Sequence, residues 1–222
     1  MRLLLARHAR TASNVAALLD TAPPGPELDA YGHAQALRLA ARLAGARLGG
    51  VYSSDLVRAV QTAEPVAAAG GLRPVTLPGL REIGGGHDEM SADLQRYLAV
   101  LRSWGQGDAA ARIPGGESGD EFVARFGDAV RLVANAGHET ALIVSHGAAI
   151  RTWAGHVMPQ VHVELGASGL PNTTVIVADG DPDAGWRLLG IDYPEHDPDH
   201  GFHRLSLRSG PRGRTGRSSA LP

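Results

Sequence analysis

Two histidines of this chain each follow a short apolar segment. His8 comes after residues 3–6 and Arg7, and His146 follows residues 140–144 by one serine. Apolar runs of this kind indicate buried strands, and ligands of open α/β sheets bind just outside the carboxyl ends of the strands. If the two strands are neighbours, both imidazoles reach one edge, where helix N-termini also point, and such an edge favours an anion. Arg7 and His8 alone are equally compatible with a solvated strand end, but the second histidine in a matching position favours a functional site.

Arg58 and Glu82 are two further residues whose positions suggest chemistry. Arg58 falls in the first turn of a helix expected after residues 50–54, where the helix dipole disfavours a cation. A bound oxyanion at that helix start would offset the cost, although an exposed arginine is also common there. Glu82 stands beside a loop that follows a short strand, and a carboxyl group in such a place can act as a proton donor.

The elements that must position these residues follow from apolar periodicity and turn residues. The expected strands cover residues 3–6, 50–54, 74–77, 140–144, 173–178 and 186–191. The expected helices cover residues 31–48, 55–69, 88–104, 119–135 and 148–157, with Asp55 as the N-cap of the second. Gly84, Gly85 and Gly86 must form either a mobile segment or a tight turn. Strands that alternate with helices indicate an α/β layer structure with an at least partly parallel sheet.

The bulk composition indicates one domain. The chain has 222 residues, of which 43% are hydrophobic and 20% are charged. We expect one core over residues 1–193 and a flexible Gly-, Ser- and Arg-rich extension over residues 194–222. The net charge of −2 argues against a nucleic-acid partner. No apolar run approaches the roughly 20 residues of a membrane helix, and a site that begins at Arg7 leaves no room for a signal peptide. We therefore expect a cytoplasmic protein without a membrane partner.

Two absent residue types exclude whole mechanisms. The chain has no Cys, which excludes disulfides, thiolate nucleophiles and Cys-ligated zinc. All 21 basic residues are Arg, so Schiff-base chemistry and the lysine of a P-loop are also excluded. An anion site must therefore be built from Arg, His, backbone N–H groups and helix ends. The His- and Asp-rich stretch 195–203 contains many possible metal ligands, but we interpret it as a solvated tail because no folded element fixes their geometry.

These segments together resemble the motifs of the histidine phosphatase superfamily, in its phosphoglycerate mutase-like branch. The matches occur in the family's order and cover the chain from Arg7 to about Thr174. Each motif alone is weak, but the ordered set is specific. The matching segments are Arg7-His8-Ala9 for Arg-His-Gly, residues 53–63 for the Ser-Ser-x-x-x-Arg-Ala-x-Gln-Thr-Ala motif, residues 80–83 for Leu-Arg-Glu-Ile, residues 114–118 for Pro-Gly-Gly-Glu-Ser, residues 145–147 for the second histidine motif, and residues 172–174.

The resemblance implies a fold, a reaction and roles for the residues. The implied fold is a three-layer α/β/α sandwich with a mostly parallel, mixed central sheet. His8 would attack phosphorus to give a phosphohistidine, and Glu82 would protonate the leaving oxygen and later activate water. No cofactor and no metal would be needed. The implied phosphate contacts are Arg7, Arg58 and His146, with assistance from Thr11, Asn14 and Gly147.

The chain departs from the family pattern at two places. Ala9 replaces the usual glycine and adds a methyl group where the backbone approaches phosphate, which we expect to be tolerated. Residues 84–89 read Gly-Gly-Gly-His-Asp-Glu, where the family often has Phe-Gly-x-Trp-Glu-Gly, so we expect a looser wall beside Glu82.

A phosphatase that hydrolyses small phosphorylated metabolites is the function that the sequence favours. The family's phosphoglycerate mutases carry a longer segment after the catalytic Glu, with Lys and paired Arg, whereas Arg96, Arg102 and Arg112 are separated here. The alternatives are a mutase-type phosphotransferase and, less favoured, a non-catalytic module that binds a phosphorylated ligand. A metal-binding protein would rest on the His-rich tail alone. The sequence does not predict the substrate or the oligomeric state.

Overall fold

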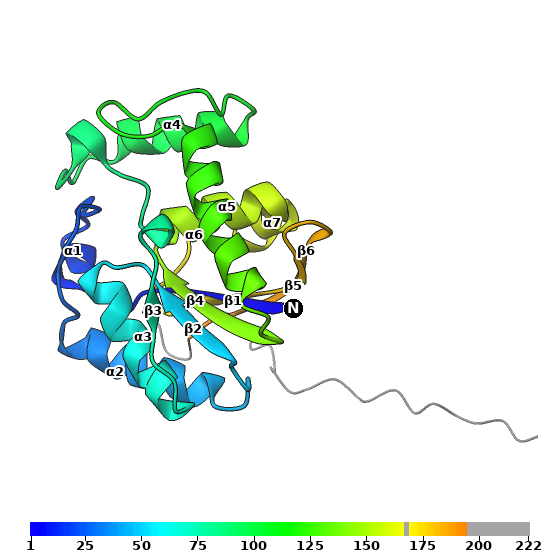
Figure 1. Cartoon of the computed structure of the whole chain (residues 1–222). Coiled ribbons are helices and arrows are strands. Elements are labelled where there is room, and N and C mark those ends of the chain that lie inside the picture. The colour runs from blue at the N-terminus through cyan, green and yellow to red at the C-terminus, as the bar shows by residue number, and fades with distance from the viewer. Residues whose placement is uncertain (167–168, 195–222) are drawn as a thin grey trace, which may run out of the picture.

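The chain folds around one six-stranded sheet. The computed structural model describes residues 1–166 and 169–194. The strands stand in the order β3-β2-β4-β1-β5-β6, between a layer with α2 and α3 and a layer with α5, α6 and α7, beyond which α4 lies (Figure 1). Their bounds are Arg2–Arg7 for β1, Gly50–Ser53 for β2, Val75–Thr76 for β3, Thr140–Ser145 for β4, Val175–Asp181 for β5 and Gly185–Asp192 for β6.

The sheet is mixed, and its register places the two histidines side by side. Strands β3, β2, β4 and β1 are parallel, whereas β5 runs antiparallel to β1 and β6 antiparallel to β5. Arg7 at the end of β1 pairs with Ser145 at the end of β4, so His8 and His146 leave the sheet at the same edge. The three-layer α/β/α fold implied by the resemblance is confirmed.

Successive side chains of β1 pack into the hydrophobic core on opposite faces of the sheet. Leu3 and Leu5 pack in the cluster that includes Phe122 and Phe126, and Leu4 packs in the cluster of the opposite face. Each buried side chain of this size stabilises a fold by about 1.5–3 kcal/mol, so the strand that carries His8 is firmly held. The covering helices are α2 (Ala30–Leu43) and α3 (Val57–Ala69) on one face, and α5 (Gly119–Asn135), α6 (Gly147–Val157) and α7 (Gln160–Leu165) on the other. Helix α4 (Gln95–Gly105) packs beyond this second layer, against α6.

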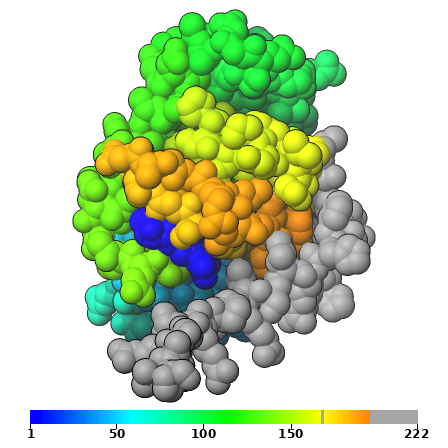
Figure 2. Space-filling model, turned by 90° about the vertical axis from the view of Figure 1, so that its right-hand side faces the viewer, coloured from blue at the N-terminus to red at the C-terminus, as the bar shows by residue number. Residues whose placement is uncertain are grey.

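The antiparallel strands β5 and β6 close one side of the sheet. In Figure 2 this hairpin, in orange, lies beside the blue amino-terminal segment and below the yellow helices α6 and α7. The Met1 ammonium group donates a hydrogen bond of 2.8 Å to the Gly180 carbonyl, which fixes the start of β1 against β5. The hairpin therefore covers the flank of β1 that β4 leaves open.

Asp55 does not cap a helix, and this prediction was wrong. Leu56 occupies the N-cap of α3 without a side-chain hydrogen bond. Asp55 instead accepts two hydrogen bonds from Arg81, 2.7 Å from Nε to Oδ1 and 2.5 Å from Nη2 to Oδ2. A bidentate, charge-assisted pair is stronger than a single bond to a helix N–H group, which explains why the carboxylate turns away from the helix.

The helix expected over residues 88–104 is shorter than predicted. A 3₁₀ turn covers Gly86–Asp88, and α4 begins only at Gln95. Met90 has a φ of 61°, a left-handed conformation that no α-helix accommodates. The three glycines 84–86 therefore form a tight turn, tied down by hydrogen bonds from the Gly85 N–H to Thr21 Oγ1 (2.8 Å) and from the His87 N–H to the Pro114 carbonyl (2.8 Å).

The described part of the chain has neither a membrane-spanning helix nor a cluster of metal ligands. No helix within residues 1–166 and 169–194 is long and apolar enough to span a bilayer. Over the same residues, no three His, Cys, Asp or Glu side chains come together in a way that could hold a metal ion. The His-rich stretch 195–203 lies outside the described residues, as does the predicted extension 194–222 apart from Pro194.

Candidate active site

His8 and His146 form the centre of a buried site at the carboxyl edge of the sheet. Their ring centroids lie 5.1 Å apart, and the side chains are 3% and 0% exposed. His8 Nδ1 lies 2.7 Å from the Ala9 carbonyl oxygen. Because a carbonyl oxygen only accepts hydrogen bonds, Nδ1 carries the proton, which leaves the lone pair on Nε2. His8 therefore presents Nε2 as a potential nucleophile.

Arg58 places its guanidinium group directly against that lone pair. It is the second residue of α3 and is only 3% exposed. Its Nε donates to His8 Nε2 at 3.2 Å, and its Nη2 donates to the Asp20 carbonyl at 2.9 Å. The Asp20 carboxylate lies 3.9 Å from Nη1 and compensates part of the cation's charge. Arg58 is thus held on both sides, with its N–H groups next to the imidazole of His8.

Several polar atoms at the centre of the site have no hydrogen-bond partner among the described residues. Within the described residues, neither ring nitrogen of His146 nor Nη1 of Arg58 makes a hydrogen bond. Buried polar atoms are nearly always paired, because an unmade hydrogen bond costs about 1–3 kcal/mol. A cation and an imidazole with free hydrogen-bonding capacity beside His8 indicate a place for an anionic ligand.

Arg7 and the start of α6 complete the positive edge. Arg7 Nη1 donates to the Leu170 carbonyl at 2.6 Å, which directs the side chain across the end of the sheet. Gly147 is the first residue of α6, and a Cβ atom there would lie 3.2 Å from Arg7 Nε. The lack of a side chain at 147 therefore lets the Arg7 guanidinium group lie close to the N-terminus of α6. The guanidinium group and the helix N-terminus both favour a bound anion.

Electrostatics keep both imidazoles neutral. Burial lowers the pKa of His8 well below its ordinary value of 6.5, and the nearby charges of Arg58 and Arg7 lower it further. Burial likewise lowers the pKa of His146 far below its ordinary value, again with a contribution from Arg58. At neutral pH the Nε2 lone pair of His8 is therefore not lost to a proton.

Glu82 lies between a short 3₁₀ turn at Pro78–Leu80 and the N-terminus of α6. Its carboxylate accepts N–H bonds from Ile83 at 2.9 Å, Ala148 at 3.2 Å and Ala149 at 2.7 Å. These bonds favour the charged form, and yet burial outweighs them and raises the pKa of Glu82 above its ordinary 4.5. A carboxyl group with a raised pKa is suited to giving and taking a proton.

Thr11 and Asn14 lie next to this centre and hold each other. Thr11 is the N-cap of α1 (Ala12–Val15), and the two residues exchange hydrogen bonds as a capping box. Asn172 joins them to the site, since its Nδ2 donates to Asn14 Oδ1 at 3.3 Å and to the His8 carbonyl at 2.8 Å. The structure thus brings both residues next to the strand that ends at His8, with the Thr11 hydroxyl already engaged as a cap.

The Ala9 methyl group points into an apolar cluster with Leu28 and Ala36. The Ala9 N–H donates to Thr62 Oγ1 at 2.9 Å, and the Thr62 hydroxyl donates to the Arg58 carbonyl at 2.7 Å. The extra methyl group relative to glycine therefore has its own packing place. Thr62 connects the strand of His8 to the helix of Arg58.

The family model of the histidine phosphatase superfamily (branch 1) matches residues 3–192. The chain belongs to this superfamily. The match spans every residue of the site described above, from Arg7 to Asn172, and it confirms the resemblance seen in the motifs. This histidine phosphatase domain therefore occupies nearly all of the described chain.

Curated relatives agree with the assignment to the family. The chain is 36% identical over 159 residues to a probable phosphoglycerate mutase GpmB of Proteus mirabilis, covering 68% of this chain and 71% of that protein. It is 32% identical over 207 residues to the PE-PGRS family protein PE_PGRS11 of Mycobacterium tuberculosis, covering 84% of this chain. The matched region spans 35% of that relative's length.

Solved structures of this family share the fold. A mycobacterial glucosyl-3-phosphoglycerate phosphatase superimposes with a TM-score of 0.70 and 25% identity, over 85% of this chain and 96% of that one. An alpha-ribazole phosphatase from Shigella flexneri gives a TM-score of 0.66 and 28% identity, over 85% of this chain and 96% of its own. The chain thus shares the fold of solved proteins that include phosphatases.

Arg125 is a site-supporting residue that the sequence did not reveal. It lies on α5, and Nε and Nη2 donate to the Glu117 carboxylate at 3.0 and 2.6 Å. The remaining N–H groups donate to three carbonyls, of Gly79 at 2.9 Å, Arg81 at 3.1 Å and Glu82 at 3.3 Å. Arg125 thus uses all five of its donors to clamp the segment that carries Glu82.

Two further side chains complete this clamp. The Ser145 hydroxyl donates to the Leu80 carbonyl at 2.7 Å, and the Tyr97 hydroxyl donates to the Ile83 carbonyl at 3.1 Å. Every carbonyl from residue 79 to residue 83 therefore accepts a side-chain hydrogen bond. Of the Arg125–Glu117 pair, only Glu117 lies in a motif that the sequence reveals. The pairing itself gave no signal in the sequence, because a Glu and an Arg eight residues apart do not form a helical i,i+3 or i,i+4 pair.

Replacing Arg125 by methionine should loosen Glu82 without touching the phosphate site. We expect the free energy of unfolding to fall by about 1–3 kcal/mol, because three carbonyls and a carboxylate lose their donor. We also expect kcat/KM for an alkyl phosphate to fall about 10-fold more than for an aryl phosphate, because only the alkyl oxygen depends on a well-placed proton donor. Urea unfolding and initial rates measure both effects.

Arg112→Met provides the matched control. Arg112 also pairs with a glutamate, Glu121, but both side chains are 53% exposed, and such surface pairs contribute about 0–1 kcal/mol. Replacement of Arg112 should leave unchanged the ratio of kcat/KM for the alkyl phosphate to kcat/KM for the aryl phosphate. Equal losses on both substrates in Arg125→Met would contradict the positioning of Glu82 by Arg125.

Proposed function

We propose that this protein is a phosphatase that hydrolyses small phosphate monoesters through a phosphohistidine on His8. The observation that carries the proposal is the Nε2 lone pair of His8, oriented by the Ala9 carbonyl and facing the Arg58 guanidinium group. The ring of His146, with both nitrogens unpartnered among the described residues, lies 5.1 Å from the ring of His8 between centroids. A phosphoryl group there would meet a nucleophile and donors for its oxygens at once.

The first half of the reaction forms the phosphoenzyme. His8 Nε2 attacks phosphorus, an N–P bond forms, and the bond between phosphorus and the leaving oxygen breaks. Glu82 gives its proton to that oxygen, so the product leaves as a neutral alcohol. Arg7, Arg58 and His146 stabilise the charge on the equatorial oxygens during transfer, and Thr11, Asn14 and Gly147 complete the phosphate contacts.

The second half returns the enzyme to its starting state. The Glu82 carboxylate takes a proton from water while the water oxygen attacks phosphorus, and the N–P bond breaks to release phosphate. His8 is then neutral again and Glu82 is protonated again, so no proton is gained or lost over the cycle. We propose that no metal ion takes part, because the two arginines and His146 can supply the positive field.

A mutase-type reaction is the alternative, supported by the relative described as a probable phosphoglycerate mutase. In that reaction a second hydroxyl group of the substrate would take the phosphoryl group instead of water. The absence of lysine in this chain leaves fewer cations for a substrate carboxylate, which favours hydrolysis. The substrate proposed here is a small phosphorylated metabolite in the cytoplasm, with neither nucleic acid nor a membrane as partner.

Turnover of p-nitrophenyl phosphate tests the phosphatase directly. We expect release of nitrophenol and phosphate in equal amounts, at a rate that EDTA does not change. Turnover that EDTA abolishes would contradict the metal-independent mechanism. Phosphate binding without any turnover would instead indicate a non-catalytic module, and transfer to an added phosphoglycerate without phosphate release would indicate the mutase.

The pH profile of kcat/KM should show the ionisation of His8 and Glu82. The first step requires neutral His8 and protonated Glu82. Because the pKa of His8 is lowered, the acid limb should lie below pH 6.5; because the pKa of Glu82 is raised, the alkaline limb should lie above pH 4.5. After correction for substrate ionisation, Glu82→Gln should remove the alkaline limb and keep the acid limb. An alkaline limb that survives this change would exclude Glu82 as its source.

A further inference from the structure

A cleft of about 560 Å³ opens beside Glu82. Its size lies within the range of roughly 300–1,000 Å³ that is usual for small-molecule sites. It is lined by the loop 21–23, by residues of the segment 78–82 and by the glycine turn 84–86. Glu89, Glu117 and Arg125 also line it.

Two residues link the cleft to the proposed phosphate site. Glu82 lines the cleft and also carries the proton for the leaving oxygen in the proposed reaction. The loop 21–23 continues from Asp20, whose carbonyl holds Arg58. A substrate whose leaving oxygen lies at Glu82 therefore places the rest of its leaving group in this cleft.

The two cations of the cleft are already neutralised. Arg125 spends all five donors on Glu117 and on three backbone carbonyls. Arg81 is paired in a bidentate manner with Asp55. Neither guanidinium group offers an uncompensated charge to a substrate carboxylate.

Glu89 adds a negative charge that forms no ion pair with a cation of the described residues, although its field also reaches Arg58. Its carboxylate accepts N–H bonds from Thr21 at 2.7 Å and Ala22 at 2.9 Å, and it also accepts the Thr21 hydroxyl. None of the ion pairs found within residues 1–166 and 169–194 involves Glu89. With both arginines compensated, the cleft carries a net negative charge from Glu89, beside the proton donor Glu82.

We propose that the cleft selects an uncharged, hydroxyl-bearing leaving group of about the size of a hexose or a nucleoside. The proposal rests on the phosphatase function given above. Within the cleft lining, a leaving group with its own carboxylate or phosphate group meets the field of Glu89 and no uncompensated arginine, so it is disfavoured. Neutral hydroxyl groups meet hydrogen-bond acceptors on the carboxylates and on the loop carbonyls.

Glycerol 3-phosphate and 3-phosphoglycerate test the charge selection, because their carbon skeletons match and only one leaving group carries a carboxylate. Repulsion between two unit charges a few ångströms apart in a partly screened site changes a rate constant about 10-fold. We therefore expect kcat/KM to favour glycerol 3-phosphate by about 10-fold or more. Glu89→Gln, which keeps an acceptor for the loop N–H groups, should reduce this ratio to about threefold or less.

Glu64→Gln is the matched control, because Glu64 is exposed on α3 and does not line the cleft. The ratio of kcat/KM for glycerol 3-phosphate to kcat/KM for 3-phosphoglycerate should be the same in Glu64→Gln as in the unchanged protein. Equal kcat/KM for the two substrates, or a ratio that Glu89→Gln does not change, overturns the charge selection while turnover of p-nitrophenyl phosphate still upholds the phosphatase. Absence of turnover on every monoester overturns both.

Gly84 allows a separate test of size. A Cβ atom at this position would meet no atom within 4 Å, so a side chain can leave the backbone here without a clash at its first carbon. We expect Gly84→Leu to lower kcat/KM for glucose 6-phosphate about 10-fold relative to glycerol 3-phosphate, because it takes up space in the cleft. An unchanged ratio would show that the leaving group lies elsewhere.

Discussion

Replacing His8 by alanine is expected to lower kcat for p-nitrophenyl phosphate by about 10⁴-fold or more, because the covalent route loses its nucleophile. The remaining arginines and His146 should still bind phosphate. His8 is buried, so the variant's folding must be compared by urea unfolding alongside initial rates and phosphate binding. Loss of turnover with retained phosphate binding is the expected result.

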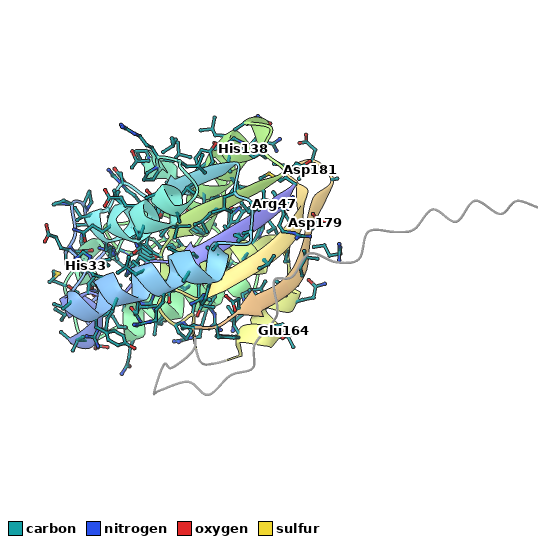
Figure 3. All side chains as sticks on the ribbon, turned by 90° about the horizontal axis from the view of Figure 1, so that it is seen from below. His33, Arg47, His138, Glu164, Asp179 and Asp181 are labelled. Atoms are coloured by element: carbon teal, nitrogen blue, oxygen red, sulfur yellow. The ribbon has the colours of Figure 1, made fainter. Side chains whose placement is uncertain are left out.

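His33→Ala is a matched control for this experiment. His33 is an exposed histidine of α2, labelled in Figure 3, and it lies outside the candidate site. Its replacement should leave kcat within about twofold, as is usual for surface changes. A folded His8→Ala protein with more than about one hundredth of the original kcat would exclude His8 as the nucleophile.

Glu82→Gln is expected to have the second largest effect, and the size should depend on the leaving group. For an alkyl phosphate we expect kcat/KM to fall by about 10²–10³-fold, because the poor leaving oxygen needs a proton. For p-nitrophenyl phosphate the loss should stay below about 10-fold, because the aryl oxygen leaves as an anion. The use of kcat/KM confines the comparison to formation of the phosphoenzyme.

Glutamine is the appropriate replacement because its side-chain oxygen can still accept the N–H bonds of Ile83, Ala148 and Ala149. The local geometry is thereby kept while the proton is removed. In a series of aryl phosphates, kcat/KM should fall more steeply with increasing leaving-group pKa in Glu82→Gln than in the unchanged protein. Equal losses across the series would contradict proton donation by Glu82.

The central pair of histidines could be predicted because the signal is local. Each apolar strand ends at its histidine, and alternation of strands and helices makes the strands parallel. The sequence could not show that β1 and β4 are neighbours, since the two strands are far apart along the chain. The structure shows that they are, with Arg7 paired with Ser145. Arg58 could be predicted in the same way, from its place in the first turn of α3.

The support of Glu82 could not be predicted, because it depends on side chains that meet only in the folded molecule. Arg125 and Tyr97 reach the segment 79–83 from two different helices, α5 and α4. Asp55 was misassigned because a local capping signal competes with a bidentate arginine, Arg81, that is remote in sequence. Residues 84–89, which lack the usual aromatics, form an ordered wall through Glu89 and Thr21.

Trapping the phosphoenzyme tests the central claim most directly. The protein is mixed with excess p-nitrophenyl phosphate, quenched with alkali within the first turnovers, digested and analysed by mass spectrometry and phosphorus NMR. The mechanism predicts one acid-labile phosphoryl group on Nε2 of His8, absent from His8→Ala and accumulating in Glu82→Gln, where activation of water is impaired. Steady turnover in the same samples with His8 unmodified, or with the phosphoryl group on another residue, would contradict it.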